Sequence, residues 1–161
     1  MPQPTMRKTL LPPMSVPYAG SEPAWLDLER LARVEVSSED PAHPVEEALR
    51  MGRPSGWRAG ASGAQTLRLC FDEPQLLQRI RVQFEERQHE RRQEFALRWS
   101  ADGTSFREIV RQQWNFSPSG STREAENYVV VLAGVAVLEL HIVPDTSGGD
   151  ARASLAELRI A

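Results

Sequence analysis

A serine and an aspartate stand two residues apart in the segment RWSADGTSFREI, at Ser100 and Asp102. A nucleophilic serine needs a general base beside it and donors that stabilise an oxyanion. The Gly-x-Ser-x-Gly pattern of a nucleophile elbow is absent, because RWSAD lacks the first glycine. Asp-Gly instead supplies the positive φ of a tight hairpin, and Ser and Asp side chains bond their own backbone in turns. The segment is therefore predicted to be a turn between two strands.

A second candidate lies in QQWNFSPSGSTRE, where Trp114 and Phe116 flank Asn115 before a loop rich in serine. A ring face and an amide at the mouth of a loop suit a sugar, because the ring stacks on the sugar and the amide bonds its hydroxyls. The same groups are typical of a protein–protein hot spot. A third interpretation places both aromatic rings in the buried end of a strand. If the ring of Trp114 is exposed, Trp114→Ala is expected to abolish binding while the domain stays folded.

Three further residues are candidates for the same binding site. His43 lies in the loop PAHP and is either a loop residue that bonds the backbone or a ligand contact. Arg58 follows Trp57, whose packing would hold Arg58 in position at the surface. Arg92 belongs to the charged connection FEERQHERRQEF. This connection is interpreted either as a solvated hairpin with internal ion pairs or as an arginine loop that binds an acidic partner.

No metal, cofactor or catalytic centre is expected from the residue pattern. The three histidines are far apart in sequence, and none forms a short ligand pair. Cys70 is the only cysteine, which excludes an intrachain disulfide and a cysteine-based metal cluster. The glycines of SGGD are not followed by a helix signal, so they do not indicate a phosphate loop. The sequence therefore predicts a protein that is not an enzyme and has no cofactor.

Length and composition are those of one soluble domain. The chain has 161 residues, of which 40% are hydrophobic and 25% charged, and its formal net charge is -3. No global basic field is present, so a nucleic-acid partner is not expected. No apolar run reaches the roughly 18 residues of a membrane span. The apolar run after Arg7 and Lys8 is too short for a secretory signal, and a cytoplasmic location is the expectation.

The elements that must position these residues are mostly strands. Residues 1–24 are rich in proline and predict an extended arm, either as a tail or as a strap across the domain, before a domain over 25–161. A short helix is expected in SEPAWLDLERLA, capped by Ser21 with Pro23 near its start. Another is expected over Pro44–Met51. From Arg33 onward, short runs alternate between apolar and polar residues and are separated by turn signals.

This pattern predicts about eight strands in an all-β antiparallel sandwich or jelly roll. The strand-like runs are RVEVS, TLRLCF, RIRVQFEE, EFALRWS, NYVVVLAG, AVLELHIVP and SLAELRI. The predicted core comprises Val34, Val36, Leu67, Leu69, Ile80, Val82, Phe84, Phe95, Leu97, Trp99, Leu138, Leu140 and Leu158.

Several segments resemble the discoidin, or coagulation factor 5/8 type C, family when they are taken in order. They are VEVSSEDPAHPVEEAL, GWRAG, TLRLCFDEPQLLQRIRV, the S-x-DG-x-x-F of Ser100 to Phe106, and the closing SLAELRI with Glu157. The resemblance covers the chain from about Arg33 to its end. It implies the galactose-binding-like jelly roll, with a short helix after the first strand. Members are mostly non-catalytic modules that bind sugars, lipid head groups or proteins through loops at one end.

One departure from the family concerns calcium. The family often has Asp-Gly after the short helix, and that aspartate helps to hold a structural calcium ion. This chain has Met51-Gly52 instead, and a thioether is a poor ligand for a hard cation. Glu157 and backbone carbonyls remain. The expectation is that no calcium site is required for folding.

A second resemblance implies a different kind of partner. The segment SSEDPAHPVEEAL…WRAGASGAQTLRL is similar to the amino-terminal domain of the single-strand-break repair scaffold. That domain has the same jelly roll and contacts protein and gapped DNA. Two functions therefore remain open: a carbohydrate-binding module, and an intracellular protein-interaction or scaffold domain. The glycan or protein partner itself is not specified by the sequence.

Overall fold

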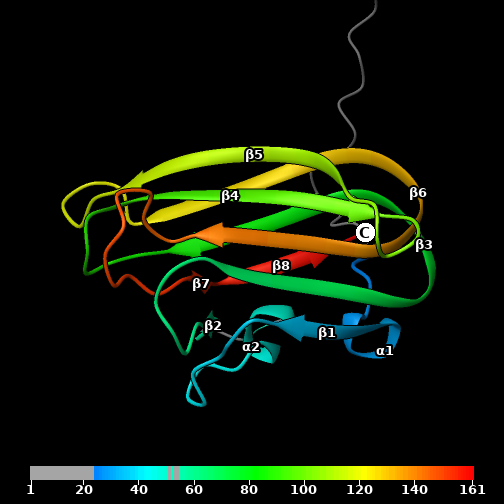
Figure 1. Cartoon of the computed structure of the whole chain (residues 1–161), viewed down its shortest axis with the longest axis horizontal. Helices are drawn as coiled ribbons and strands as arrows, with labels where there is room; N and C mark the ends of the chain where they lie inside the picture. The colour runs from blue at the N-terminus through cyan, green and yellow to red at the C-terminus, as the bar shows by residue number, and fades with distance from the viewer. Residues whose placement is uncertain (1–23, 51, 53–54) are drawn as a thin grey trace, which may run out of the picture.

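The computed structural model describes residues 24–50, 52 and 55–161 (Figure 1). The predicted arm falls outside the described residues except for Ala24, as do Ser21, Pro23 and Met51. Two short helices are present in the described part, α1 (Leu28–Leu31) and α2 (Glu46–Leu49). Helix α2 lies within the predicted Pro44–Met51 segment. No described helix is long and apolar enough to span a membrane.

Strands dominate the described chain, as the alternation of apolar and polar residues predicts. The model contains β1 (Ala32–Val36), β2 (Trp57–Arg58), β3 (Gln65–Glu85), β4 (Arg91–Ser100), β5 (Arg107–Phe116), β6 (Arg123–Val143), β7 (Ser154–Leu155) and β8 (Glu157–Ile160). All pairings between these strands are antiparallel. The prediction of an antiparallel β-sandwich is confirmed.

Strands β3 and β6 are each longer than the sequence pattern indicates. TLRLCF and RIRVQFEE form one strand, and so do NYVVVLAG and AVLELHIVP. In β3 the register shifts between Cys70 and Arg79, a span that contains Pro74, which has no N–H to donate. In β6 the bend includes Gly134, whose φ of 71° suits glycine. Such irregularities bend a strand without ending it, so each strand passes from one layer of the sandwich to the other.

The bends divide the sheet into two layers, which Figure 1 views face-on. The first layer has the order β1-β3-β6-β4-β5 and uses residues 65–70 of β3 and 137–143 of β6. The second layer consists of β8, residues 79–85 of β3 and residues 123–129 of β6. Phe84 from the second layer meets Phe95 from the first, with ring centroids 5.1 Å apart. This contact shows that the two layers face each other across the core.

The core contains most of the residues that the alternation predicts. Leu67, Leu69, Ile80, Val82, Phe84, Phe95, Leu97, Leu138, Leu140 and Leu158 are all buried. Val34, Val36 and Trp99 pack against this core but are only partly buried. Val34 and Val36 are on the edge strand β1, and both line a cavity beside α1 and α2, so they are not fully covered.

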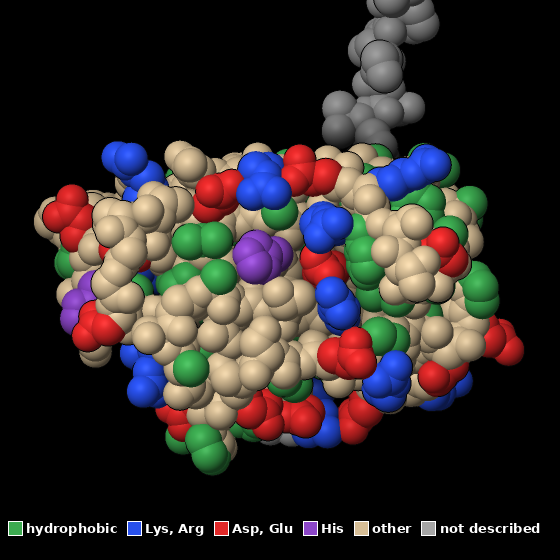
Figure 2. Space-filling view, in the orientation of Figure 1, with side chains coloured by type: hydrophobic (Ala, Val, Ile, Leu, Met, Phe, Trp, Pro, Cys, Tyr) green, Lys and Arg blue, Asp and Glu red, His purple; other side chains and the backbone are tan. Residues whose placement is uncertain are grey.

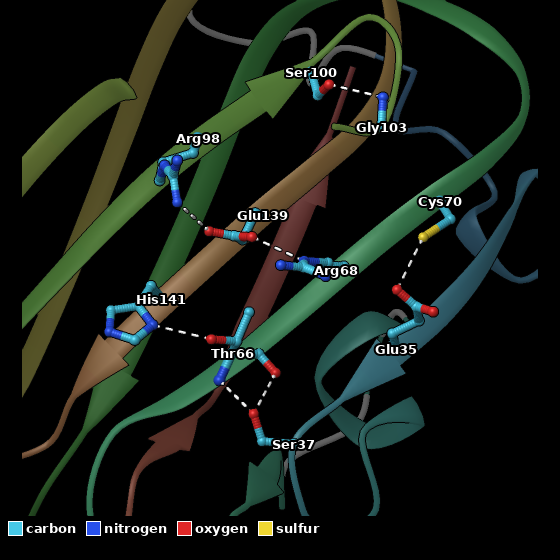
Figure 3. A network of polar contacts seen from close by, with 10 residues as sticks. All are labelled: Glu35, Ser37, Thr66, Arg68, Cys70, Arg98, Ser100, Gly103, Glu139 and His141. Carbon is cyan, nitrogen blue, oxygen red and sulfur yellow. Dashed lines mark hydrogen bonds and ion pairs between the residues drawn. The ribbon is translucent and has the colours of Figure 1, made fainter. Parts of the chain in front are cut away.

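The segment that contains Ser100 and Asp102 is a turn, as predicted. The Ser100 hydroxyl donates to Asp102 Oδ1 at 2.9 Å. It accepts from the Gly103 N–H at 2.8 Å (Figure 3). The N–H groups of Ser105 and Thr104 also donate to Asp102, and they lower the pKa of its carboxyl. Both side chains are therefore occupied in shaping the β4–β5 turn, with Gly103 at φ 82°.

The outer face of the first layer carries a network of paired charges. Glu139 on β6 is 3% exposed and bridges Arg68 on β3 and Arg98 on β4, at 2.8 and 3.1 Å (Figure 3). Both guanidiniums also lie over the ring of Phe106, at 5.4 and 5.1 Å. Figure 2 shows acidic and basic side chains interspersed over this face, without a large patch of one sign. This network joins three strands and leaves no oxygen of Glu139 without a partner.

The space between β5 and the second layer contains polar side chains. The Gln112 side-chain amide donates to Glu126 Oε1 at 2.5 Å across the sandwich. Its Oε1 accepts from the Tyr128 hydroxyl at 2.6 Å. Glu124 is 1% exposed, and neither of its carboxylate oxygens has a hydrogen-bond partner in the described structure. Burial, with a smaller contribution from Glu126, raises the pKa of Glu124 to about 7.

Candidate binding site

Three chain connections meet at one end of the sandwich, on the left in Figure 1. They are residues 86–90 between β3 and β4, 117–122 between β5 and β6, and 144–153 between β6 and β7. The Glu86 N–H donates to Thr122 O at 2.8 Å, and the Thr146 N–H donates to Arg92 O at 2.8 Å. These backbone bonds join the connections into one surface.

A groove of about 510 Å³ lies at this end, lined by the ends of β4 and β5 and by the connections 86–90 and 144–153, and we call it the Asn115 groove. Its lining is Glu90, Arg91, Arg92, Asn115, Phe116, Asp145, Thr146 and Ser147. Arg92 and Asn115 are cross-strand partners on β4 and β5, and both are exposed. Arg92 Nε donates to Asn115 Oδ1 at 3.2 Å. The structure thus brings together two residues that the sequence analysis assigned to one site from separate segments.

Arg91 forms the floor of the Asn115 groove. Its side chain is only 2% exposed, and it pairs with Glu86 at 2.9 Å. It also donates to Gln93 Oε1 and to Pro144 O, and lies 5.0 Å over the ring of Phe116. Burial lowers the pKa of this guanidinium, while the Glu86 carboxylate opposes that shift.

The charged connection has the internal ion pairs that the hairpin interpretation predicts, Arg91–Glu86 and Arg87–Glu85, but the Arg91 side chain is buried instead of solvated. Arg91 has the same strand phase as Phe95, so its side chain points inward while that of Arg92 points outward. The alternation in RRQEF carried this signal. The buried arginine fixes the β3–β4 connection to the start of the β6–β7 connection through Pro144.

Asp145 supplies an acceptor on the opposite wall of the groove. The Ser147 hydroxyl and N–H donate to Asp145 Oδ1 at 2.6 and 3.0 Å. These bonds lower the pKa of Asp145, so its carboxyl is ionised at neutral pH and accepts hydrogen bonds instead of donating a proton. Asp145 was not among the residues predicted for the site, although PDTSGG is a typical turn sequence in which aspartate bonds the backbone.

His43 and Arg58 line a different hollow on the other side of the β3–β4 connection. This Arg58 pocket has a volume of about 220 Å³. Its lining is His43, Ser55, Trp57, Arg58, Glu85, Glu86, Arg87, Gln88, Arg152, Ser154, Leu155 and Ala156. The Asn115 groove and the Arg58 pocket share one wall, because residues 85–88 line the pocket and residues 90–92 line the groove. The five predicted site residues therefore do not form a single cluster.

Trp114 does not have the exposed ring that the sugar and hot-spot interpretations require. It lies between the exposed residues Gln113 and Asn115, so its side chain faces the interior of the sandwich. The indole packs against the core, and its Nε1 is buried without an acceptor in the described structure. This agrees with the interpretation that places Trp114 and Phe116 in the buried end of a strand. A role for Trp114 in ligand binding stays a prediction.

A larger cavity of about 620 Å³ lies beside α1, α2 and β1. Apolar side chains form much of its wall, including Leu26, Leu28, Val34 and Val45. It does not contain any of the five predicted site residues. Charged side chains also line it, including Glu39, Glu46 and Arg159.

Solved structures with a similar fold were found by comparison with known proteins, although sequence comparison found no relative. No family model matches the sequence, and no curated protein matches it. A pectin-binding carbohydrate-binding module superposes with a TM-score of 0.60 at 17% identity, covering 81% of this chain and 90% of the module. The CBM32 of AlyQ, in complex with 4,5-unsaturated mannuronic acid, superposes with a TM-score of 0.61 at 17% identity, covering 86% of this chain and 98% of that one.

A third similar structure is CpGH89CBM32-4 from Clostridium perfringens, in complex with GlcNAc-α-1,4-galactose. It gives a TM-score of 0.62 at 14% identity and covers 87% of this chain and 96% of that one. The chain has the galactose-binding-like jelly-roll fold. At these identities the likeness establishes the fold alone. The comparisons give no support to the resemblance to the single-strand-break repair scaffold.

The calcium expectation for this jelly roll can be tested by chelation. Among the described residues no group of three His, Cys, Asp or Glu side chains is arranged to hold a metal. Glu157 is paired with the buried Arg159 at 3.1 Å. A bound ion would stabilise the folded state by mass action, and its removal would lower Tm. We expect no such ion, so a chelator should leave Tm unchanged in thermal unfolding. A fall in Tm that added calcium restores would contradict the expectation.

Proposed function

We propose that this chain is a non-catalytic carbohydrate-binding module on a discoidin-type jelly roll, and that it binds a saccharide in the Asn115 groove. The observation that carries the proposal is the meeting of Arg92, Asn115 and Asp145 around one exposed groove. Guanidinium and amide groups donate in fixed planes, and an ionised carboxylate accepts. Together they match the alternating donors and acceptors of neighbouring sugar hydroxyls.

Shape and setting also support a saccharide ligand. A groove of about 510 Å³ lies in the size range of small-molecule sites. The groove is built on strand ends and tied loops, so its polar groups are positioned before a ligand arrives. Two of the similar structures are described as complexes with sugars, and a third as a pectin-binding module.

A protein-interaction surface is the alternative that the sequence leaves open. Such a surface usually centres on an exposed aromatic or aliphatic anchor. At this end of the sandwich Phe116 is fully buried and Trp114 faces the core. The polar groove therefore favours the saccharide over the protein partner.

Removal of the Asn115 amide tests the proposed site. A glycan array would identify ligands, and calorimetry would then compare wild type, Asn115→Ala and Gln113→Ala with the best of them. Gln113 is the matched control, because it is an exposed amide two residues away on the same strand. Asn115→Ala is expected to weaken binding about tenfold or more, since about 1.4 kcal/mol of lost hydrogen bonding is tenfold in Kd.

Gln113→Ala should keep the wild-type affinity, and all three proteins should have similar Tm. A chain that binds no glycan on the array, or an Asn115→Ala variant with unchanged affinity, would contradict the proposal. Tight binding of a protein from a defined panel, lost in Asn115→Ala, would instead support the scaffold alternative.

A further inference from the structure

Two arginines project onto the same side of the small β2–β7 sheet. Arg58 on β2 is the cross-strand partner of Ser154 on β7, and Arg152 precedes Ser154 by two residues. Side chains two residues apart on an extended chain share a face, so Arg58 and Arg152 are diagonal neighbours. Both residues are exposed, and both line the Arg58 pocket.

Neither of these guanidiniums has a hydrogen-bond or ion-pair partner in the described part of the chain. The carboxylates nearby are already engaged. Glu86 accepts from Arg91 at 2.9 Å, and Glu85 is 3.7 Å from Arg87. By contrast, Arg68, Arg98 and Arg111 elsewhere on the molecule each pair with a carboxylate.

The backbone beneath the two arginines is held firmly. Trp57 is 1% exposed, and its indole N–H donates to Ser38 O at 3.1 Å. The Arg58 N–H donates to His43 O at 3.1 Å, and Arg58 O accepts from the Asp40 N–H at 2.8 Å. A Cβ at Gly56 would lie 2.5 Å from Leu155 O, so only glycine allows this close approach of β2 to β7. The pocket is therefore formed before any ligand binds.

We propose that the Arg58 pocket binds the carboxylate of a uronic acid residue, through Arg58 and Arg152. This inference rests on the proposed function, because the same saccharide would place its neighbouring unit in the Asn115 groove across the shared wall. Arginine binds carboxylates with paired N–H donors, and both side chains lack any other acceptor in the described structure. His43 and Ser154 border the same pocket and supply polar groups for ring hydroxyls.

A single carboxylate suits this pocket better than a phosphate chain. Glu85 and Glu86 lie in its wall and disfavour a polyanion by repulsion. Nucleic-acid binding requires a basic surface that follows many phosphates. The net charge here is -3, and charges of both signs alternate over the face in Figure 2.

The test compares acidic saccharides with neutral counterparts of the same shape. Trimers of galacturonate and of mannuronate, and their carboxyl-reduced forms, would be titrated calorimetrically into wild type, Arg58→Gln, Arg152→Gln and the double variant. Arg107→Gln is the control, because Arg107 is exposed at the opposite end of β5. Wild type and control are expected to bind an acidic trimer at least tenfold more tightly than its neutral form.

The double variant should lose this preference while keeping the affinity for the neutral form and the Tm of wild type. Equal binding of acidic and neutral trimers by wild type, or a preference that survives in the double variant, overturns the uronate assignment alone. Failure to bind any saccharide overturns the proposed function as well. A sulfated trimer or single-stranded DNA could bind wild type more tightly than both uronate trimers and lose that affinity only in the Arg58 and Arg152 variants. This result would overturn the carboxylate assignment in favour of another oxyanion.

Discussion

Replacement of Phe95 by alanine is expected to lower the free energy of unfolding by about 3–5 kcal/mol. Phe95 is 1% exposed on β4, and its ring meets that of Phe84, which comes from the opposite layer. The substitution removes apolar surface from the core and leaves a cavity where the two layers meet. Chemical denaturation monitored by tryptophan fluorescence would measure the loss.

Val131→Ala is the control for this measurement. Val131 is 79% exposed on β6, so its truncation should change the free energy of unfolding by no more than about 0.5 kcal/mol. A loss at Phe95 no larger than the loss at Val131 would contradict the position of Phe95 between the layers and indicate a different strand register.

Replacement of Glu124 by glutamine is expected to raise the stability of the folded state at pH 8 by about 3 kcal/mol. The pKa of Glu124 rises from 4.5 to about 7 because burial disfavours the carboxylate. Each pKa unit corresponds to about 1.4 kcal/mol between the two protonation states. Glutamine has the shape of the protonated acid and does not ionise, so the folded protein avoids this cost.

The sign of the pH dependence follows from proton binding. Between pH 4.5 and about 7, folded Glu124 holds a proton that the unfolded chain has released. The free energy of unfolding of wild type should therefore fall across this interval and level off above it. Asp102 and Asp145 have lowered pKa values, so their contributions are lost at more acidic pH.

The measurement is the difference in unfolding free energy between Glu124→Gln and wild type at several pH values. It should be small near pH 4.5 and grow to its full value near pH 8. Glu73→Gln is the control, because Glu73 is exposed at the bend of β3. A difference at Glu124 that does not change with pH, or matches that of Glu73, would show that the carboxyl is ionised in the folded protein throughout.

Local pattern alone determines much of this fold. Alternation along EFALRWS and RIRVQFEE placed Phe95, Leu97, Ile80 and Val82 in the core, because a strand gives successive side chains to opposite faces. The Ser100–Asp102 turn was equally predictable, since its hydrogen bonds join residues within a few positions of each other.

Continuity of β3 and β6 depends on tertiary structure. The DEP segment and Gly134 look like breaks between strands, but each strand continues through them, and the pairing of β3 with β6 resumes after register shifts. Each long strand has its partner along both halves, and this pairing between distant segments outweighs the local turn signals. A single sequence does not reveal that partner, because the paired residues Gln65 and Ile142 are far apart in the chain.

The candidate site shows the same division. Residue type alone made Arg92, Asn115, Arg58 and His43 candidates for binding, and all four line hollows at one end of the sandwich. Tertiary structure decided that they line two hollows instead of one, and that Arg152 and Asp145 join them from the β6–β7 connection. It also turned Trp114 inward and buried Arg91. Strand phase gives the direction of each side chain, but only the packing of the opposite layer decides whether that direction leads to solvent or into the core.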